Sequence, residues 1–351
     1  MKVGILGTGA IANKHAQAYR NIGFDLIACS NKTEPRGREF GERWGAEFVP
    51  SYKDLCQYSG LDYVDVCTFP NFHLEPVQAC AEIKRAVLVQ KPMATNLQTA
   101  RQMIEVARTA GITLGVMSQH RFDDSTLFLK RALAAGRLGR LLQADAYVKW
   151  FRSDEYYSRA IKGSWETEGG GALINQAIHQ VDILLYLAGS VTSVSGIWQL
   201  GARHNIESED IVNALLSYQS GATGVIQAAT AFWPGYTERI ELHGTKGSAT
   251  ISGDRLTGWD VLDDETANAE DPAPVEGNVA SGSSDPLAIS LTSFERQFRD
   301  FGESIIDRRE PLVSGEEGYR ALEVVIGIYD SCRAKQPVGM SEQSFPMLFK
   351  A

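Results

Sequence analysis

The chain begins with the stretch Met1-Lys2-Val3-Gly4-Ile5-Leu6-Gly7-Thr8-Gly9-Ala10-Ile11-Ala12. Its first six residues are a short apolar run that predicts a strand, and the amphipathic stretch through Tyr19 predicts a helix directly after the glycines. Gly7 permits a tight turn, Gly9 lets a pyrophosphate touch the backbone, and Ala12 allows close packing of the helix. A strand, a glycine turn and a helix in this order predict a dinucleotide site.

The second apolar run, Asp25–Cys29, predicts a strand whose carboxyl end faces the adenosine ribose of the cofactor. No acidic residue follows it to accept hydrogen bonds from both ribose hydroxyls. Small polar and basic groups stand there instead, and they suit a 2′-phosphate, so we expect NADP to bind at least as well as NAD. The alternative is that Lys32, Arg36 and Arg38 are only a solvated helix start. The residues of these two turns expected at the cofactor are Gly7, Gly9, Ala10, Ile11, Ser30, Asn31 and Lys32.

Strands and helices alternate up to about Met117. Further strands are predicted at Tyr63–Cys67, Ala86–Val89 and Ile112–Met117, and helices at Glu34–Trp44, Leu74–Lys84 and Leu97–Thr109. This alternation predicts a Rossmann domain, a doubly wound parallel sheet, over residues 1–118.

The pattern changes after Ser118, where a helix at Ser125–Ala135 is followed mainly by strands. These are predicted at Gln143–Arg152, Thr192–Gln199, Ile211–Gln219, Thr223–Phe232, Thr237–Leu242 and Ser248–Ile251. Strands without intervening helices predict an α/β domain over residues 119–351 with a large, mostly antiparallel open sheet. Asp263–Pro286 is rich in acidic and small residues and is expected to be a mobile excursion. The closing helices, Leu287–Asp307 and Gly315–Ala334, are able to pack back on the first domain.

The chain of 351 residues has a formal net charge of −9, with 44% hydrophobic and 22% charged residues. This balance is ordinary for a globular protein of two domains, and the negative charge argues against nucleic acid or an anionic membrane as a partner. Because the sequence shows neither a charged leader nor an apolar run of membrane-spanning length, we expect a cytoplasmic protein without a membrane partner. The five cysteines show neither a disulfide framework nor metal-ligand spacing, so no metal is expected.

Two polar segments follow strands of the first sheet, where open parallel sheets bind their ligands. The loop after Cys67 contains Thr68, Pro70, Asn71 and His73, which are able to face a nicotinamide, although an ordinary loop and helix cap would look similar. The tripeptide Gln90-Lys91-Pro92 follows Val89. Its lysine is a point cation on a stem fixed by the proline, able to touch both cofactor and substrate, and the Lys91–Pro92 bond is a candidate for the cis form.

The segment from Gly169 to Asp182 carries three glycines and then a mostly apolar helix. Asn175 and His179 are four residues apart, so both side chains emerge from one face. Polar groups there are costly unless they pair or bind something, and the glycines let backbone approach a ligand closely. The pattern predicts a catalytic site, and the alternative is a helix start followed by a satisfied core histidine.

In this order, the glycine turn, the loop Pro70-Asn71-Phe72-His73, Gln90-Lys91-Pro92 and the Gly169–Asp182 segment resemble the Gfo/Idh/MocA oxidoreductase family, over nearly the whole chain. The resemblance implies a Rossmann domain followed by an α/β domain, with the active site between them and a homodimer or homotetramer formed through the open sheet. It also implies that Lys91 and His179 are catalytic and that Asn175 stands where the family usually has a catalytic aspartate.

Two residues depart from the family pattern. Gln90 replaces the usual glutamate, so Lys91 lacks a nearby anion, and Asn175 replaces the usual aspartate, which removes charge stabilisation of a protonated His179. We therefore expect His179 to stay neutral near pH 7, in the form that accepts a hydroxyl proton.

These features predict reversible oxidation of a secondary alcohol of a sugar, sugar derivative or cyclic polyol. Hydride passes to nicotinamide C4, His179 takes the hydroxyl proton, Lys91 stabilises the alkoxide, and Asn175 orients the substrate or the imidazole. Two alternatives are an NAD-dependent glycoside hydrolase of the same superfamily and a non-catalytic dinucleotide-binding sensor. Sugars need hydrogen-bond donors and aromatic faces, and the candidates that supply them besides Asn175 and His179 are Arg121, Arg152, Tyr157, Trp165 and Tyr236. For Trp150 and Trp165, core packing would explain the sequence equally well.

Overall fold

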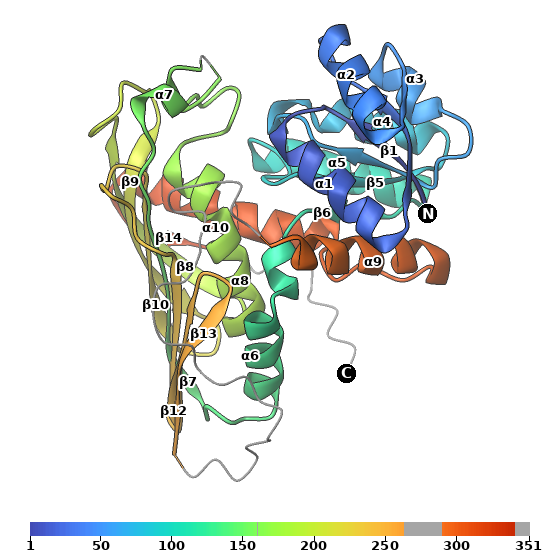
Figure 1. The fold of residues 1–351 in the computed structure, drawn as a ribbon. Helices are drawn as coiled ribbons and strands as arrows, with labels where there is room; N and C mark the ends of the chain where they lie inside the picture. Colours follow the sequence, from blue (N-terminus) through green and yellow to red (C-terminus); the bar gives the residue numbers. More distant parts are fainter. Residues whose placement is uncertain (160, 263–289, 341–351) are drawn as a thin grey trace. The chain divides into compact units, whose positions relative to one another are not determined.

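The structure is a computed structural model that describes residues 1–159, 161–262 and 290–340. The chain folds into two compact units, coloured along the sequence in Figure 1. The first comprises residues 1–122, 166–169 and 290–319, and the second comprises the described parts of 123–165, 170–289 and 320–351. The segment expected to be a mobile excursion, Asp263–Pro286, lies outside the described residues.

The first unit is built on a six-stranded parallel sheet in the order β3-β2-β1-β4-β5-β6. Its strands are β1 (Lys2–Leu6), β2 (Asp25–Ser30), β3 (Glu47–Phe48), β4 (Tyr63–Val66), β5 (Ala86–Val89) and β6 (Leu114–Val116). The chain winds outward from β1 in both directions, so the predicted Rossmann fold is confirmed. The carboxyl ends of β1, β4 and β5 lie at one edge of the sheet, which is where this fold holds a dinucleotide.

Helices connect these strands, and their ends follow simple local rules. They are α1 (Ala10–Ile22), α2 (Glu34–Trp44), α3 (Tyr52–Gln57), η1 (Pro70–Phe72), α4 (Leu74–Glu82), α5 (Leu97–Ala110) and η2 (Gln119–Phe122). The side chain of Asn96 accepts a hydrogen bond of 2.9 Å from the N–H of Thr99 and so caps the start of α5. Gly111 ends that helix in the left-handed conformation, which glycine adopts without strain.

Helix α9 (Leu291–Asp307) comes from the far end of the sequence and belongs to the first unit. It packs on α1, where the ring of Phe298 lies 4.2 Å from the ring of Tyr19 and 5.0 Å from that of His15. Phe301 lies 5.1 Å from Tyr63 of β4. The core of the first unit therefore depends on residues from the far end of the chain, more than 200 positions away.

The second unit is built on an eight-stranded sheet in the order β13-β12-β11-β7-β10-β9-β8-β14. Its strands are β7 (Leu141–Lys149), β8 (Val191–Leu200), β9 (Glu209–Tyr218), β10 (Thr223–Ala229), β11 (Arg239–Gly244), β12 (Gly247–Ser252), β13 (Arg255–Val261) and β14 (Val338–Gly339). Neighbouring strands are antiparallel except β7 and β10, which are parallel. This confirms the mostly antiparallel sheet predicted from the sequence.

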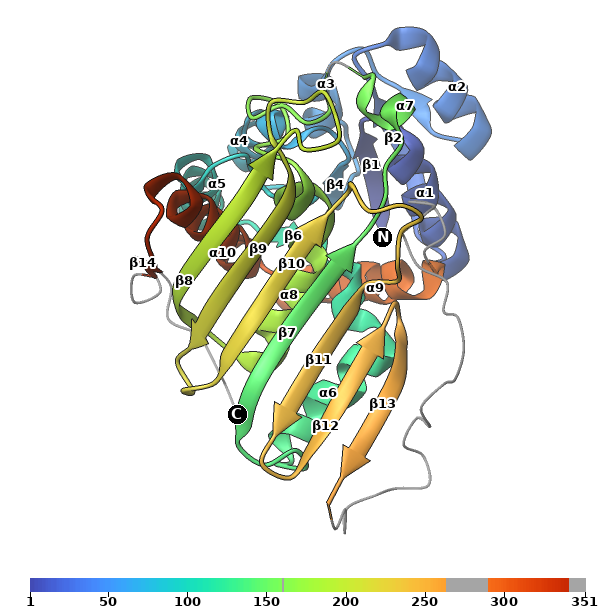
Figure 2. The same ribbon diagram turned by 90° about the vertical axis from the view of Figure 1, so that its left-hand side faces the viewer.

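Helices α6 (Asp124–Ala134) and α8 (Ile178–Ala188) lie on one face of this sheet, and the other face is turned toward the viewer in Figure 2. The short α7 (Asp154–Tyr157) follows β7, a π-helical turn η3 (Ala172–Ala177) precedes α8, and α10 (Gly315–Ala334) follows α9 in the chain. No helix within the described residues is long and apolar enough to cross a membrane.

Some elements were not predicted or end elsewhere. The strands β3 and β14 and the helix α3 were missed, because two-residue strands and a six-residue helix give almost no periodic signal. The seven-residue strand β13 was missed as well, because Gly258 and Asp260 are residue types that strands disfavour. The strand expected at Gln143–Arg152 ends at Lys149, after which only an isolated bridge joins Phe151 to Ala231.

The packing of α9 predicts a large difference between two substitutions on the same helix. Phe298→Ala empties space in the core and is expected to lower the free energy of unfolding by about 3–5 kcal/mol. Ile306 is 69% exposed, so Ile306→Ala is expected to change the free energy by less than about 0.5 kcal/mol. Urea denaturation of both variants measures this, and equal losses would show that α9 does not pack as described.

Candidate functional site

The glycine turn between β1 and α1 has the shape that an anion site requires. Gly7 has a φ of +88°, and its N–H donates to the carbonyl oxygen of Ser30 at 2.8 Å. A Cβ at Gly7 would stand 2.9 Å from the carbonyl oxygen of Cys67, whereas a Cβ at Gly9 would meet nothing within 4 Å. Gly9 also precedes the first turn of α1, whose N–H groups have no helical acceptor. The turn therefore leaves room for a pyrophosphate at a helix N-terminus.

Asn31 ties this turn to the end of β2. Its Oδ1 lies 3.3 Å from the N–H of Thr8, and its Nδ2 donates to the carbonyl oxygen of Thr33 at 2.9 Å. Lys32 and Arg36 are exposed beside it, and Ser30 is buried. Arg38 forms an ion pair of 2.8 Å with Glu34 one turn away on α2. Arg38, one of the basic residues considered for a 2′-phosphate, therefore already pairs with a carboxylate on its own helix.

His73 joins the loop after β4 to the loop after β5. It is fully buried, with Nδ1 at 3.0 Å from the carbonyl oxygen of Met93 and Nε2 at 3.2 Å from that of Thr68. Burial lowers the pKa of His73 to about 4, although the two backbone carbonyls act in the opposite direction. The imidazole is therefore neutral at pH 7 and shapes the loop, while Asn71 of the same loop is exposed and Pro70 is buried.

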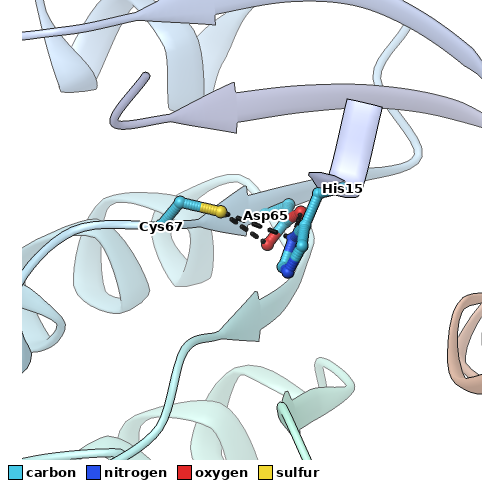
Figure 3. Close-up of side chains that lie close together, drawn as sticks. All are labelled: His15, Asp65 and Cys67. Atoms are coloured by element: carbon cyan, nitrogen blue, oxygen red, sulfur yellow. Dashed lines mark hydrogen bonds and ion pairs between the residues drawn. The ribbon is translucent and has the colours of Figure 1, made fainter. Parts of the chain in front are cut away.

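A buried hydrogen-bonded network lies directly before Lys91. The side-chain nitrogen of Gln90 lies 2.9 Å from Nε2 of His15. On the other side of the ring, Nδ1 of His15 lies 2.6 Å from Oδ2 of Asp65 (Figure 3). The hydroxyl of Tyr19 donates to the same carboxylate oxygen at 2.7 Å. An amide nitrogen only donates, so Nε2 accepts and Nδ1 carries the proton that it donates to Asp65.

The atoms of His15, Asp65 and Cys67 that could hold a metal ion lie within 4.8 Å of one another (Figure 3). Hydrogen bonds account for the first two, and burial together with the Asp65 carboxylate raises the pKa of the Cys67 thiol well above its usual value. We therefore assign the cluster to holding Gln90, next to the Lys91–Pro92 peptide bond, which is cis as the sequence suggested.

In the second unit, Asn175 lies in the π-helical turn η3 and His179 in the first turn of α8. All residues from Glu168 to Leu184 are buried except these two, which are half-buried. Single π-helical turns are rare in proteins, and many of those that occur lie at functional sites. The polar pair is thus the one part of this segment that solvent or a ligand reaches.

Two of the glycines before this turn serve packing within the second unit. A Cβ at Gly170, whose φ is +148°, would stand 2.5 Å from the hydroxyl oxygen of Tyr329. A Cβ at Gly171 would stand 1.8 Å from the carbonyl oxygen of Glu209. We expected these glycines to let the backbone approach a ligand. In the structure they let the backbone approach strand β9 and helix α10 instead.

Arg152 and Tyr157, two of the expected substrate residues, are brought together by His204. The carbonyl oxygen of Arg152 lies 2.9 Å from Nε2 of His204, whose ring is 4.5 Å from that of Tyr157. The hydroxyl of Tyr157 lies 2.8 Å from Oγ1 of Thr230. Nδ1 of His204 lies 3.1 Å from Oδ2 of Asp210. These residues form a polar cluster on the chain around β7, β9 and β10.

Asp210 holds the loop that carries His204. Its oxygens accept backbone hydrogen bonds from Ala202 and Arg203, both at 2.9 Å. Burial acts to raise the pKa of Asp210, but the hydrogen bonds from His204 and the loop backbone outweigh it and lower the pKa to about 2. The carboxylate is therefore charged at pH 7. Sequence reasoning missed both His204 and Asp210, and the only available signal was the acidic pair at the start of a predicted strand.

The other expected substrate residues lie elsewhere. The ring of Trp165 packs 5.6 Å from Trp198 and 5.2 Å from Tyr329, so core packing explains it. Arg121 is buried in the first unit and pairs with Glu317 at 2.7 Å. Tyr236 is exposed on the loop after β10. The indole of Trp150 donates to Glu238 at 3.0 Å.

Two family models match the chain. Residues 1–118 match the oxidoreductase family with an NAD-binding Rossmann fold, and residues 126–250 match the GFO/IDH/MocA C-terminal domain. Among curated relatives, myo-inositol 2-dehydrogenase of Thermotoga maritima is 29% identical over 97% of this chain and 99% of its own length. The scyllo-inositol 2-dehydrogenase (NAD(+)) of Bacillus subtilis is 26% identical over 96% of each chain.

Among solved structures, the WlbA dehydrogenase of Bordetella pertussis, in complex with NADH and UDP-GlcNAcA, superposes with a TM-score of 0.85. It is 26% identical and covers 96% of this chain and 98% of its own. The two family models, the glycine turn and the order of the two sheets agree along the chain, which therefore belongs to the GFO/IDH/MocA family of NAD(P)-binding oxidoreductases.

Proposed function

We propose that this chain is an NAD(P)-dependent dehydrogenase that oxidises a secondary alcohol of a sugar, sugar derivative or cyclic polyol. The observation that carries the proposal is the half-buried pair Asn175 and His179, which emerges from a segment that is otherwise buried from Glu168 to Leu184. The inositol dehydrogenases among its relatives support this substrate class.

The residues of the first unit fit a dinucleotide. The open space at Gly9 and the N-terminus of α1 suit the pyrophosphate, and the end of β2 suits the adenosine ribose. When bound, the cofactor supplies the hydride acceptor. The residues that we propose to hold it are Gly7, Gly9, Ala10, Ile11, Ser30, Asn31, Lys32, Thr68, Pro70, Asn71, Gln90 and Lys91, with His73 acting through the shape of its loop.

His179 and Lys91 carry the proton chemistry in this proposal. A neutral imidazole of His179 accepts the proton of the substrate hydroxyl, and the ammonium of Lys91 donates a hydrogen bond to the oxygen as negative charge develops. Asn175 keeps a hydrogen-bonding group beside His179 without adding a negative charge. The buried network of Gln90 and His15 holds the backbone from which Lys91 extends.

Arg152 and Tyr157 are the residues that we propose to contact a polyhydroxylated ring. His204 is buried and touches both of them, so in this proposal it holds them in place. Purified protein incubated with aldoses, inositols, anhydrosugars and nucleotide sugars, with NAD or NADP in separate wells, tests the function. Formation of NAD(P)H with a member of the panel supports the proposal. Cleavage of a glycoside without added cofactor would favour the glycoside hydrolase instead, and cofactor binding without turnover would favour the sensor.

The catalytic pair is tested by substitution. We expect Lys91→Ala and His179→Ala each to lower kcat by about a hundredfold or more, because each removes a group acting on the same oxygen. The double variant should lose less than the product of the single losses. The matched controls, Lys53→Ala on α3 and His243→Ala on β11, should stay within about twofold. Turnover of His179→Ala close to the wild type would reject this assignment of the base.

Cofactor choice is tested at the end of β2. An aspartate at position 31 keeps an acceptor toward Thr8 and adds repulsion to a 2′-phosphate, so Asn31→Asp should shift preference toward NAD by about 1–2 kcal/mol, on the order of ten- to thirtyfold. Lys32→Gln should weaken NADP and leave NAD unchanged. Calorimetric titration of both cofactors measures the shift. A wild type that prefers NAD more than tenfold would contradict the proposed role of Lys32.

We also propose that the open face of the sheet in the second unit binds a second copy of this chain. Ile197 of β8 is 71% exposed and Leu215 of β9 is 63% exposed, and Leu215 pairs with Ser195, two residues from Ile197 on the same face. Neighbouring apolar side chains on one sheet face favour association.

Leu215→Lys should therefore shift the protein toward monomer in sedimentation velocity, because it places a charge in the apolar contact. Ile306→Lys, an equally exposed position on α9, should leave the sedimentation coefficient unchanged. A wild type that sediments as a monomer at micromolar concentration would refute the interface.

A further inference from the structure

The segment that carries Asn175 and His179 begins with backbone N–H groups that its own turns do not satisfy. The first N–H groups of any helix lack a carbonyl partner within it. Here the residues Gly171–Ile174 are buried, so these donors are removed from water and need a partner in the protein.

Glu209 and Tyr329 supply that partner. Oε2 of Glu209 accepts from the N–H of Gly171 and Oε1 accepts from that of Leu173, both at 2.7 Å. The N–H of Ile174 lies 3.3 Å from the hydroxyl oxygen of Tyr329. That hydroxyl donates to Oε1 of Glu209 at 2.9 Å. The carboxylate of Glu209 on β9 and the hydroxyl of Tyr329 on α10 thus accept three backbone hydrogen bonds from the start of this segment.

Besides accepting these hydrogen bonds, Glu209 and Tyr329 restrict where the backbone of Gly170 and Gly171 can lie. The space beside Gly171 is closed by the backbone of Glu209, and the space beside Gly170 is closed by Tyr329. Glu209 is itself the first residue of β9, where it pairs with Leu200 of β8. The N–H of Asn175 donates to the carbonyl oxygen of Gly171 at 3.0 Å. Hydrogen bonds therefore run from the sheet through Glu209 and Gly171 to Asn175.

We propose that Glu209, with Tyr329, is a positioning residue that sets where Asn175 and His179 stand. The inference rests on the proposed dehydrogenase function and adds a group that touches neither substrate nor cofactor. A carboxylate suits this place because a helix N-terminus favours negative charge. Burial outweighs the hydrogen bonds from Leu173, Tyr329 and Gly171, which act to lower the pKa of Glu209, so the net pKa is raised to about 7.

Two conservative variants test the contact. Glu209→Gln keeps the size of the side chain but turns an NH₂ group toward one of the N–H donors. Tyr329→Phe keeps the ring that packs on Trp165 and Trp198 and removes only the hydroxyl. The matched control is Tyr218→Phe, because Tyr218 is also buried and its hydroxyl donates to Ala144 at 3.1 Å in another part of the same sheet.

Steady-state kinetics with NAD(P) and myo-inositol, or whichever panel alcohol the wild type oxidises, give the first measurement. We expect kcat to fall about tenfold or more in Glu209→Gln and in Tyr329→Phe, because misplaced catalytic groups react slowly. The KM for the cofactor should stay within about twofold, since its residues are in the first unit. Tyr218→Phe should keep kcat within about twofold. Unchanged kcat in both variants, or an equal loss in the control, would overturn the proposal.

Hydrogen exchange followed by mass spectrometry gives a second measurement that needs no activity. The amides of residues 171–179 should exchange faster in Glu209→Gln and Tyr329→Phe, with the strands of the second unit protected as in the wild type. Faster exchange over the whole unit would show a general loss of stability and overturn the positioning role. A wild type without dehydrogenase activity would contradict the proposed function alone, and the exchange result would still decide the contact.

Discussion

A buried backbone donor must find an acceptor inside the protein, and this constraint shapes the segment on which the proposed chemistry depends. The residues from Gly171 to Ile174 are buried under the sheet of the second unit, so water does not solvate their N–H groups. One carboxylate, that of Glu209, takes two of these donors and is held in turn by Tyr329. This acceptor lets the apolar stretch be buried without leaving those two N–H groups unpaired, and this is the basis for the proposed positioning of its two polar side chains.

The first unit solves a similar problem with a different network. Gln90 precedes Lys91 and is held by His15, which is held by Asp65 and Tyr19. Every member is buried and hydrogen-bonded, which is the condition under which a polar network fixes a conformation. The side-chain amide of Gln90 fits this network as a donor to Nε2 of His15.

These two networks share one feature. In each, the side chain proposed for chemistry stands directly beside the network: Lys91 follows Gln90 in sequence, and Asn175 lies in the turn whose first N–H groups Glu209 accepts. The supporting groups come from distant parts of the sequence, such as α1, β4, β9 and α10. Rigid support from packed elements is what keeps a functional group within a productive geometry.

Local sequence determined much of this protein. The periodicity of apolar residues predicted the two sheets and their types, and Gly7 and Gly9 predicted the turn between β1 and α1, because these signals depend on neighbouring residues. Lys91, Asn175 and His179 were also visible, as polar residues at strand and helix ends. Sequence did not show why Gly170 and Gly171 are glycines, nor the packing and hydrogen-bonding roles of His15, His204, Glu209 and Tyr329. Those roles arise from contacts between residues far apart in the chain, such as Gly171 with Glu209 and Gln90 with His15, and only the folding of the backbone brings their atoms within hydrogen-bonding distance.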